Sequence, residues 1–206
     1  MESSPGGASS NPLADFEDVP VGHTFYNAIM WGVGLGITNG TTKTTFSPNT
    51  PCTVQTILVF IWRAMGCPEP QIENPFDNVQ MDKYYAEAAV WAFEHGLVNG
   101  TEVQTANAST EFWFDGTADC SRGDTVIFLY RMKGSQSVED LSLYEFADVT
   151  EATPELRNAV AWAKKFAITD GRGMDEKTGL KFFYPWETCT RAHVMAFLYR
   201  CLDSNA

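Results

Sequence analysis

The sequence predicts an all-α protein in which three helix-loop-helix repeats form a pseudo-threefold lobed bundle with a central three-helix core. Three observations favour this fold: a threefold internal repeat, helical spacing of apolar residues, and a glycine turn after each first helix. The 206 residues, 44% of them hydrophobic, suffice for one compact core. The predicted organisation is a linker or vector-derived segment at 1–12, a single domain at 13–202 with repeats 13–66, 73–134 and 143–202, and a tail at 203–206.

Each repeat begins with a Phe-x-Asp-Val-like turn and a first helix that carries a tryptophan nine residues before a turn glycine. The helix presents one apolar face, as the spacing of Ile29, Val33 and Ile37 indicates. The tryptophan is therefore a core residue or, beside a cleft, a flat face on which a sugar ring stacks. The equivalent residues are Trp31 and Gly40, Trp91 and Gly100, and Trp162 and Gly171.

The second helix of each repeat follows an aromatic loop anchor and begins after a cysteine and a small polar residue. The anchors are FSP at 46, FDG at 114 and FYP at 183, and the helix starts read CTVQT at 52, CSRGD at 120 and CTRAH at 189. Thr53, Ser121 and Thr190 are expected to cap these helices, with Asp124 completing a capping box in the second repeat. The apolar sequences that follow predict that the three second helices pack together at the centre.

Composition and charge exclude several classes of function. The formal net charge of −12 without a basic cluster argues against nucleic-acid binding. No apolar run approaches the roughly 20 residues that cross a bilayer, and the first twelve residues lack the features of a signal peptide. That opening suggests a piece of a longer protein. Cys52, Cys120 and Cys189 repeat in register and are expected to be small buried thiols; a three-thiolate metal site is the less favoured alternative, because structural zinc prefers four ligands. No cofactor is expected.

Taken together, these motifs resemble the S-layer homology domain, whose repeats carry a Phe-x-Asp-Val start, a Gly-Ile-x-x-Gly turn, a Phe-x-Pro loop and a Thr-Arg-Ala-Glu helix start. The resemblance covers about residues 13–202. It implies a three-lobed, secreted, non-catalytic module that anchors larger proteins to Gram-positive cell walls. The implied ligand is secondary cell-wall polysaccharide, often a pyruvylated amino sugar held in grooves between lobes.

The chain departs from the family pattern at several positions. The second repeat has Asn78 where the others have Asp18 and Asp148, and the first has Val54 where the others have Arg122 and Arg191. At most two grooves are therefore expected to retain an arginine.

The two arginines are the main candidate ligand-binding residues. A ketal pyruvate presents a fixed carboxylate, which a guanidinium at a helix start can bind with paired, charge-assisted hydrogen bonds. The alternative is that Arg122 and Arg191 form inter-repeat ion pairs with positions such as Asp18 and Asp148. The other candidates are the three tryptophans as groove walls, the glycines Gly40, Gly100 and Gly171, which permit close approach, and the carboxylates of Asp18 and Asp148. Arg63, Arg131 and Arg200, near the helix ends, are expected to be structural.

The functional prediction is a cell-surface anchoring module that binds an anionic wall glycan. The alternative is a protein-protein interaction or assembly module on the same scaffold, favoured by the loss of the motif in the first repeat. An enzyme, such as a glycosidase using two groove carboxylates, is the least favoured class.

Overall fold

The computed structural model describes residues 16–107 and 109–203, so the linker predicted at 1–12 and tail residues 204–206 lie outside the described residues. Along this part of the chain the elements are α1 (Tyr26–Gly34), α2 (Val54–Ala64), α3 (Ala86–Glu94), β1 (Thr101–Gln104), β2 (Thr110–Trp113), α4 (Arg122–Met132), the 3-10 helix η1 (Leu141–Tyr144), α5 (Pro154–Lys165) and α6 (Arg191–Leu202).

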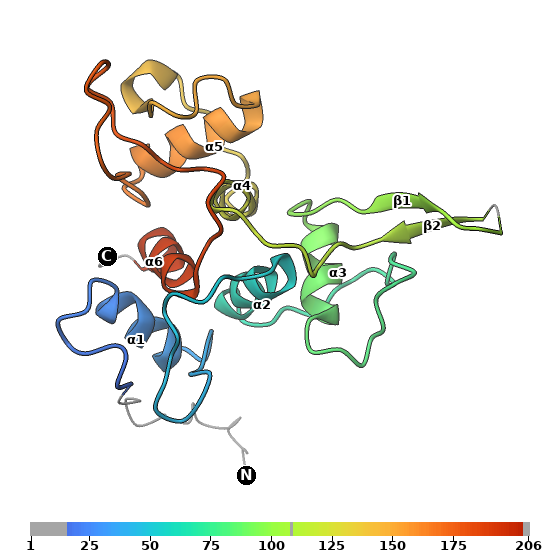
Figure 1. Cartoon of the computed structure of the whole chain (residues 1–206). Helices are drawn as coiled ribbons and strands as arrows, with labels where there is room; N and C mark the ends of the chain where they lie inside the picture. The colour runs from blue at the N-terminus through green and yellow to red at the C-terminus, as the bar shows by residue number, and fades with distance from the viewer. Residues whose placement is uncertain (1–15, 108, 204–206) are drawn as a thin grey trace, which may run out of the picture.

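Three lobes surround three central helices (Figure 1). At the centre α6 packs against both α2 and α4, and each of these helices carries an outer helix: α1 on α6, α3 on α2 and α5 on α4. Each lobe thus combines the first helix of one predicted repeat with the second helix of another. The N-terminal α1 closes the circle against the C-terminal α6, where Gly32 leaves room for the side chain of Met195.

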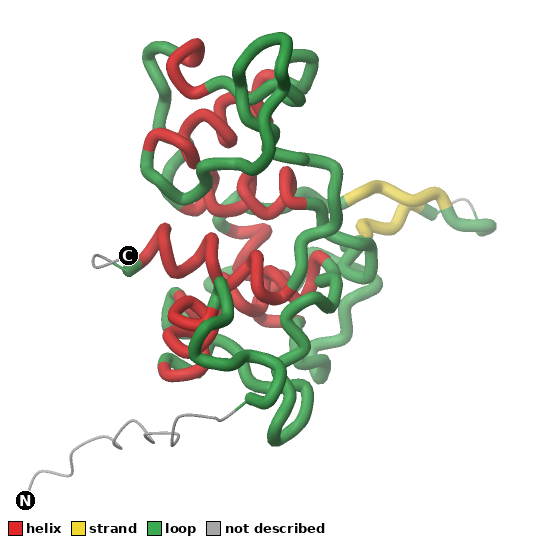
Figure 2. Tube along the Cα trace, turned by 60° about the vertical axis from the view of Figure 1, so that its left-hand side comes forward, coloured by secondary structure: helices red, strands yellow, loops and turns green. Residues whose placement is uncertain are grey.

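The prediction of an all-α fold is wrong, because the loop after α3 forms a two-stranded antiparallel sheet. Thr101 lies opposite Trp113 and Gln104 opposite Thr110, and the hairpin projects away from the helices in both views (Figures 1 and 2). This loop is the longest of the three, and its TEVQ and TEFW segments contain β-branched and aromatic residues that favour strands. Each strand has only four residues, too few for a clear alternating pattern.

The starts of the central helices confirm two of the three predicted caps. Ser121 and Asp124 form the full capping box of α4, and the hydroxyl of Thr190 accepts from the amide of His193 at the start of α6. Thr53 was predicted to cap α2 in the same way, which is wrong. Its hydroxyl bonds to the hydroxyl of Thr56 at 2.9 Å, and the amides of Val54 and Gln55 donate instead to the backbone carbonyls of Ala118 and Gly116.

One continuous hydrophobic core joins the lobes to the centre. The aromatic loop anchors belong to it: Phe46 and Phe183 are fully buried and Phe114 nearly so. These rings fix the chain as it enters each central helix. No helix in the described ranges is both long and apolar enough to cross a membrane.

Candidate functional site

The three central helices start from one point, where the backbones of three cysteines form a closed ring of hydrogen bonds. The amide of Cys52 donates to the carbonyl of Cys189, that of Cys189 to Cys120, and that of Cys120 to Cys52, at 2.8–3.0 Å. Because the helices begin at this ring, the residue two positions after each cysteine occupies an equivalent place around it. Arg122 and Arg191 take two of these places and Val54 the third.

The three cysteine side chains are buried, free thiols, as predicted. Burial raises the pKa of Cys52 to about 11 and that of Cys189 to about 12, and it raises the pKa of Cys120 as well. These thiols are therefore protonated at neutral pH. No group of three potential metal ligands occurs within the described ranges.

Arg122 is a buried cation at the first residue of α4. The residue is only 6% exposed, its Nε donates to the carbonyl of Phe183 at 3.1 Å, and its guanidinium carbon lies 5.0 Å and 5.2 Å from the ring centres of Phe183 and Phe197. Burial lowers the pKa of Arg122, and the nearby charge of Arg172 acts in the same direction. Among the described residues it forms no ion pair, although the charges of Glu187 and Asp148 act on it from a longer distance.

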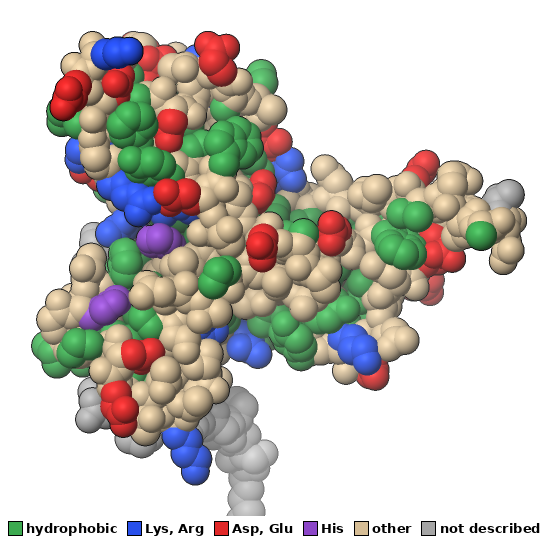
Figure 3. Space-filling view, viewed as in Figure 1, with side chains coloured by type: hydrophobic (Ala, Val, Ile, Leu, Met, Phe, Trp, Pro, Cys, Tyr) green, Lys and Arg blue, Asp and Glu red, His purple; other side chains and the backbone are tan. Residues whose placement is uncertain are grey.

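Arg122 lines a cavity of about 350 Å³ between the lobe of α4 and α5 and that of α1 and α6. The wall includes Gly171 and Arg172 from the third predicted repeat, His193 from α6 and Phe25 from the first repeat. Basic and histidine side chains gather at the notch between these two lobes (Figure 3). Arg172 pairs with Glu187 and lies over the ring of Tyr184. The cavity is therefore locally basic in a protein whose net charge is −12.

His193 contributes an unusual feature to this wall, because its Nδ1 is buried and has no hydrogen-bond partner in the described part of the chain. Its ring contacts the ring of Phe25 edge-on at 5.5 Å. Burial lowers the pKa of His193 to about 4, and the charges of Arg122 and Arg172 act in the same direction. The imidazole is thus uncharged at neutral pH and adds no cation there.

Arg191 donates more hydrogen bonds to protein atoms than Arg122 does. Its Nε donates to the carbonyl of Phe46 at 3.0 Å, and one terminal nitrogen donates to the carbonyl of Asn39 at 2.6 Å and to the hydroxyl of Thr38 at 3.3 Å. These bonds fasten α6 to the loop of the first predicted repeat. An anion at Arg191 would have to compete with these carbonyls.

Asp18 and Asp148 hold their own loops. Asp18 accepts from the amides of Phe46 and Ser47 at 2.8 and 2.7 Å, and Asp148 accepts from those of Phe183 and Tyr184 at 2.9 and 2.6 Å. The predicted alternative, ion pairs from Asp18 and Asp148 to Arg122 and Arg191, does not occur between these described residues. Both carboxylates thus have a loop-holding role, and a direct role toward a ligand stays a prediction.

None of the three tryptophans lines the Arg122 cavity, although the cavity beside Trp162 shares Arg200 with it. Trp91 and Trp162 are buried, and Trp31 is partly buried against Tyr199. Trp91 lines a separate cavity of about 430 Å³ with Arg131, and Trp162 another of about 240 Å³ with Arg200. The structure therefore does not bring a tryptophan and the arginine of a helix start into one cavity, and the stacking role stays a prediction.

The turn glycines make room for the protein's own aromatic rings. A Cβ at Gly40 would overlap Phe16, one at Gly100 would overlap Phe112, and one at Gly171 would overlap Phe146. Gly171 also has a left-handed backbone, φ +67°, and is the glycine that lines the Arg122 cavity.

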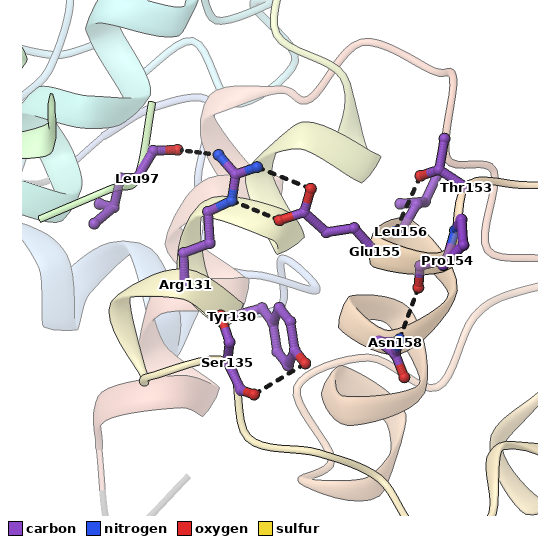
Figure 4. Close-up of polar contacts among 9 residues, drawn as sticks. All are labelled: Leu97, Tyr130, Arg131, Ser135, Thr153, Pro154, Glu155, Leu156 and Asn158. Atoms are coloured by element: carbon purple, nitrogen blue, oxygen red, sulfur yellow. Dashed lines mark hydrogen bonds and ion pairs between the residues drawn. The ribbon is translucent and has the colours of Figure 1, made fainter. Parts of the chain in front are cut away.

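The arginines near the helix ends connect the lobes. Arg131 donates to the carbonyl of Leu97 at 2.9 Å and forms a bidentate pair with Glu155 at 2.6 and 2.8 Å (Figure 4). Arg63 and Arg200 donate to the equivalent carbonyls of Ile37 and Ile168. These contacts support the structural role predicted for all three residues.

Sequence reasoning missed Arg172 and His193 as cavity residues. Arg172 directly follows Gly171, a position held by threonine in the other repeats, and His193 occupies the glutamate position of Thr-Arg-Ala-Glu. Alignment of the repeats could have singled out both positions. The fold was needed to show that His193 faces Arg122 across a lobe boundary and that Arg172 joins it from another predicted repeat.

The sequence is similar to known proteins over part of its length. Residues 15–53 match the S-layer homology domain, which confirms the resemblance over that segment. The chain is also similar to an amylopullulanase from Thermoanaerobacterium thermosulfurigenes, with 24% identity over 169 residues, and this match covers 82% of the chain but only 8% of the relative. S-layer homology domains are generally cell-surface anchoring modules that bind cell-wall polysaccharide, so the match indicates a protein of the cell surface or wall.

Proposed function

We propose that this chain anchors a larger protein to a Gram-positive cell wall by binding an anionic, pyruvylated amino sugar of the secondary polysaccharide in the Arg122 cavity. The observation that supports this is the buried guanidinium of Arg122, which has no ion-pair partner among the described residues and lines an open cavity. The chain itself is proposed to have no catalytic activity.

The chemistry of a ketal carboxylate suits this position. The terminal nitrogens of Arg122 form no hydrogen bond with a described residue, whereas Nε and the flanking rings fix the plane of the guanidinium. A carboxylate there would gain charge-assisted hydrogen bonds in surroundings largely removed from water, where they are stronger than at an exposed site. Arg172 lies on the same wall, and a cavity of about 350 Å³ is large enough for one or two sugar rings.

The other two positions around the cysteine ring are proposed to be weaker or inactive. Arg191 already donates to two carbonyls and a hydroxyl, and Val54 has no charge to offer. We therefore place the main site at Arg122 and Gly171, with a secondary site at Arg191. Asp18, Asp148, Gly40 and Gly100 would act there by shaping the loops.

The single domain of three repeats at 13–66, 73–134 and 143–202 is part of this proposal. The equivalent bonds from Arg63, Arg131 and Arg200 to the carbonyls before each turn support it. So does the closure of α1 on α6, which leaves no repeat able to complete its lobe alone.

A pull-down on purified wall sacculi tests the function. The wild type should bind sacculi that carry their secondary polysaccharide and should not bind sacculi stripped of it. Arg122→Ala/Arg191→Ala should lose binding while keeping its circular-dichroism spectrum. A matched control is Arg157→Ala, which removes a surface arginine that pairs with Glu145 outside the cavity. Binding by the folded double variant would contradict the proposal, and protease-sensitive binding that survives stripping would favour the protein-interaction alternative.

A further inference from the structure

The β-hairpin places a second open cavity on the lobe of α2 and α3, away from Arg122. This cavity of about 460 Å³ is lined by residues of the hairpin, the loop after it, and the first turn of α2. Its aromatic and apolar members are Tyr85, Val103, Trp113 and Phe114, and its polar members include Gln55, Thr101, Asp115 and Thr117. None of the cavities that contain the arginines includes these residues.

The pleat of the hairpin explains why Trp113 faces this cavity. Successive side chains of a strand point to opposite faces, so Phe112 and Trp113 diverge. Phe112 stacks on Phe76 of the lobe core, with ring centres 5.7 Å apart and planes within 8°. Trp113 shares the other face with Thr101, its partner across the sheet, and with Val103.

Trp113 is exposed and yet held in place. It is 41% exposed, and its indole N–H donates to the carboxylate of Glu111 at 2.7 Å. Burial therefore does not explain the ring's position, and the hydrogen bond fixes its orientation without covering its face. A flat aromatic face of this kind, fixed before binding, loses little conformational entropy when a ligand stacks on it.

The polar residues define what can bind. The lining contains no lysine, arginine or histidine, while Asp115 and the nearby Glu111 carry negative charge. An anion would be repelled, in contrast with the basic Arg122 cavity. Amide, hydroxyl and carboxylate groups beside an aromatic face match a sugar ring, which presents apolar C–H groups on its faces and hydroxyls around its edge.

We propose that this cavity binds an uncharged saccharide, stacked on Trp113 and hydrogen-bonded by Gln55, Asp115 and the two threonines. The site is separate from the anion site of the proposed function and does not depend on it. A chain with both sites would recognise charged and uncharged glycan segments independently.

Titration of the full chain with uncharged hexasaccharides tests this. The probes are β-1,4-linked N-acetylglucosamine, β-1,4-linked glucose and α-1,4-linked glucose, followed by tryptophan fluorescence and calorimetry. At least one should bind at one site, and Trp113→Ala should weaken it by about tenfold or more. Trp113→Phe should retain most of the affinity. The matched control is Trp186→Ala, because Trp186 is 71% exposed and outside the cavity lining.

Gln55→Ala provides a second variant that leaves the hairpin intact and should weaken binding several-fold. Circular dichroism of every variant separates lost binding from lost folding. The proposal is overturned if no hexasaccharide binds, or if folded Trp113→Ala and Gln55→Ala bind as the wild type does. It is equally overturned if a proline-rich peptide binds at Trp113 and the saccharides do not, since the partner would then be a protein.

Discussion

At the scale of the residue, a carboxylate or amide stabilises each loop that leads into a central helix. In two loops the held segment contains a non-glycine residue in a left-handed conformation, Ser47 at φ 61° and Tyr184 at φ 60°. Such residues are uncommon and persist when surrounding bonds fix them. The two carboxylates that bond to the amides of these residues are those of Asp18 and Asp148. Asn78 holds the equivalent loop of the second repeat, because its side-chain amide hydrogen-bonds to both the backbone amide and the carbonyl of Phe114.

Asp148→Ala should therefore destabilise the protein by about 2–3 kcal/mol, since two hydrogen bonds to a charged acceptor are lost. Asp148→Asn should cost about half as much, because its single amide oxygen can replace only one of the two bonds. Urea denaturation measures both. Equal losses in the two variants would show that the bonds to the carboxylate are not what holds the loop.

His193 should make stability depend on pH. Burial first, and then Arg122 and Arg172, lower its pKa from 6.5 to about 4, while Glu187 acts in the opposite direction. Above pH 6.5 the ring is neutral in both states and its contribution is fully present. Between pH 6.5 and 4 the unfolded chain binds a proton that the folded chain does not, so stability falls on acidification.

The free energy of unfolding is compared between the wild type and His193→Gln. The carboxylates titrate in both proteins, so their contribution cancels in the difference. The stability advantage of the wild type should shrink by about 1–2 kcal/mol between pH 7 and pH 4.5, after allowance for the partial exposure of the ring. Chemical denaturation at each pH gives the difference. Parallel pH curves for the two proteins would contradict a depressed pKa.

Individual residues also show how far sequence reasoning reached. Arg122 could be singled out because a cation at a helix start is unusual and repeats in register. The sequence could not show that Arg191 makes more hydrogen bonds within the protein than Arg122 does. That difference depends on whether loop carbonyls of another repeat lie within hydrogen-bond distance. The role of the tryptophans, in the core or stacked on a sugar, was also ambiguous. Periodicity places them on a helix but does not show which end of the central bundle they contact.

At the scale of the element, the three central helices share a start but differ in how it is capped. The capping box of α4 is complete, that of α6 lacks the acidic partner, and α2 has no side-chain cap. The pattern of small polar residues predicted the first two correctly. It failed for α2 because Thr53 and Thr56 bond to each other.

Ser121→Ala should cost about 1 kcal/mol, the usual loss for removing a helix cap. Thr53→Ala should cost clearly less, because no amide of α2 depends on its hydroxyl. Thermal denaturation of the two variants side by side measures this difference. Equal destabilisation would mean that Thr53 does cap α2 in solution.

The hairpin is the element that the sequence did not predict. The two short strands contain no fully buried residue and therefore lack a strong alternating pattern. The fold decides between a loop and a sheet by offering Phe76 as a surface for Phe112. The same packing turns Trp113 outward. The element that made the all-α prediction wrong thus also creates the cavity that we assign to an uncharged sugar.

At the scale of the whole molecule, a closed circle of lobes makes three related but unequal positions around the cysteine ring. Sequence repetition was sufficient to predict the lobes and the central helices. It could not predict that lobes form across repeats, since α1 finds its partner in α6 at the far end of the chain. Because the protein is acidic overall, an anion must be attracted by the local charge of the Arg122 cavity against the field of the rest of the surface.

The central claim is that the Arg122 cavity is the main site for an anionic wall glycan. Calorimetric titration with a soluble fragment of wall polysaccharide tests it most directly, on the wild type, Arg122→Ala, Arg191→Ala and the control Arg157→Ala. We predict one dominant site, weakened about 10- to 100-fold by Arg122→Ala, as expected for losing charge-assisted hydrogen bonds, and changed much less by Arg191→Ala. Three equal sites, or unchanged affinity in folded Arg122→Ala, would contradict the claim.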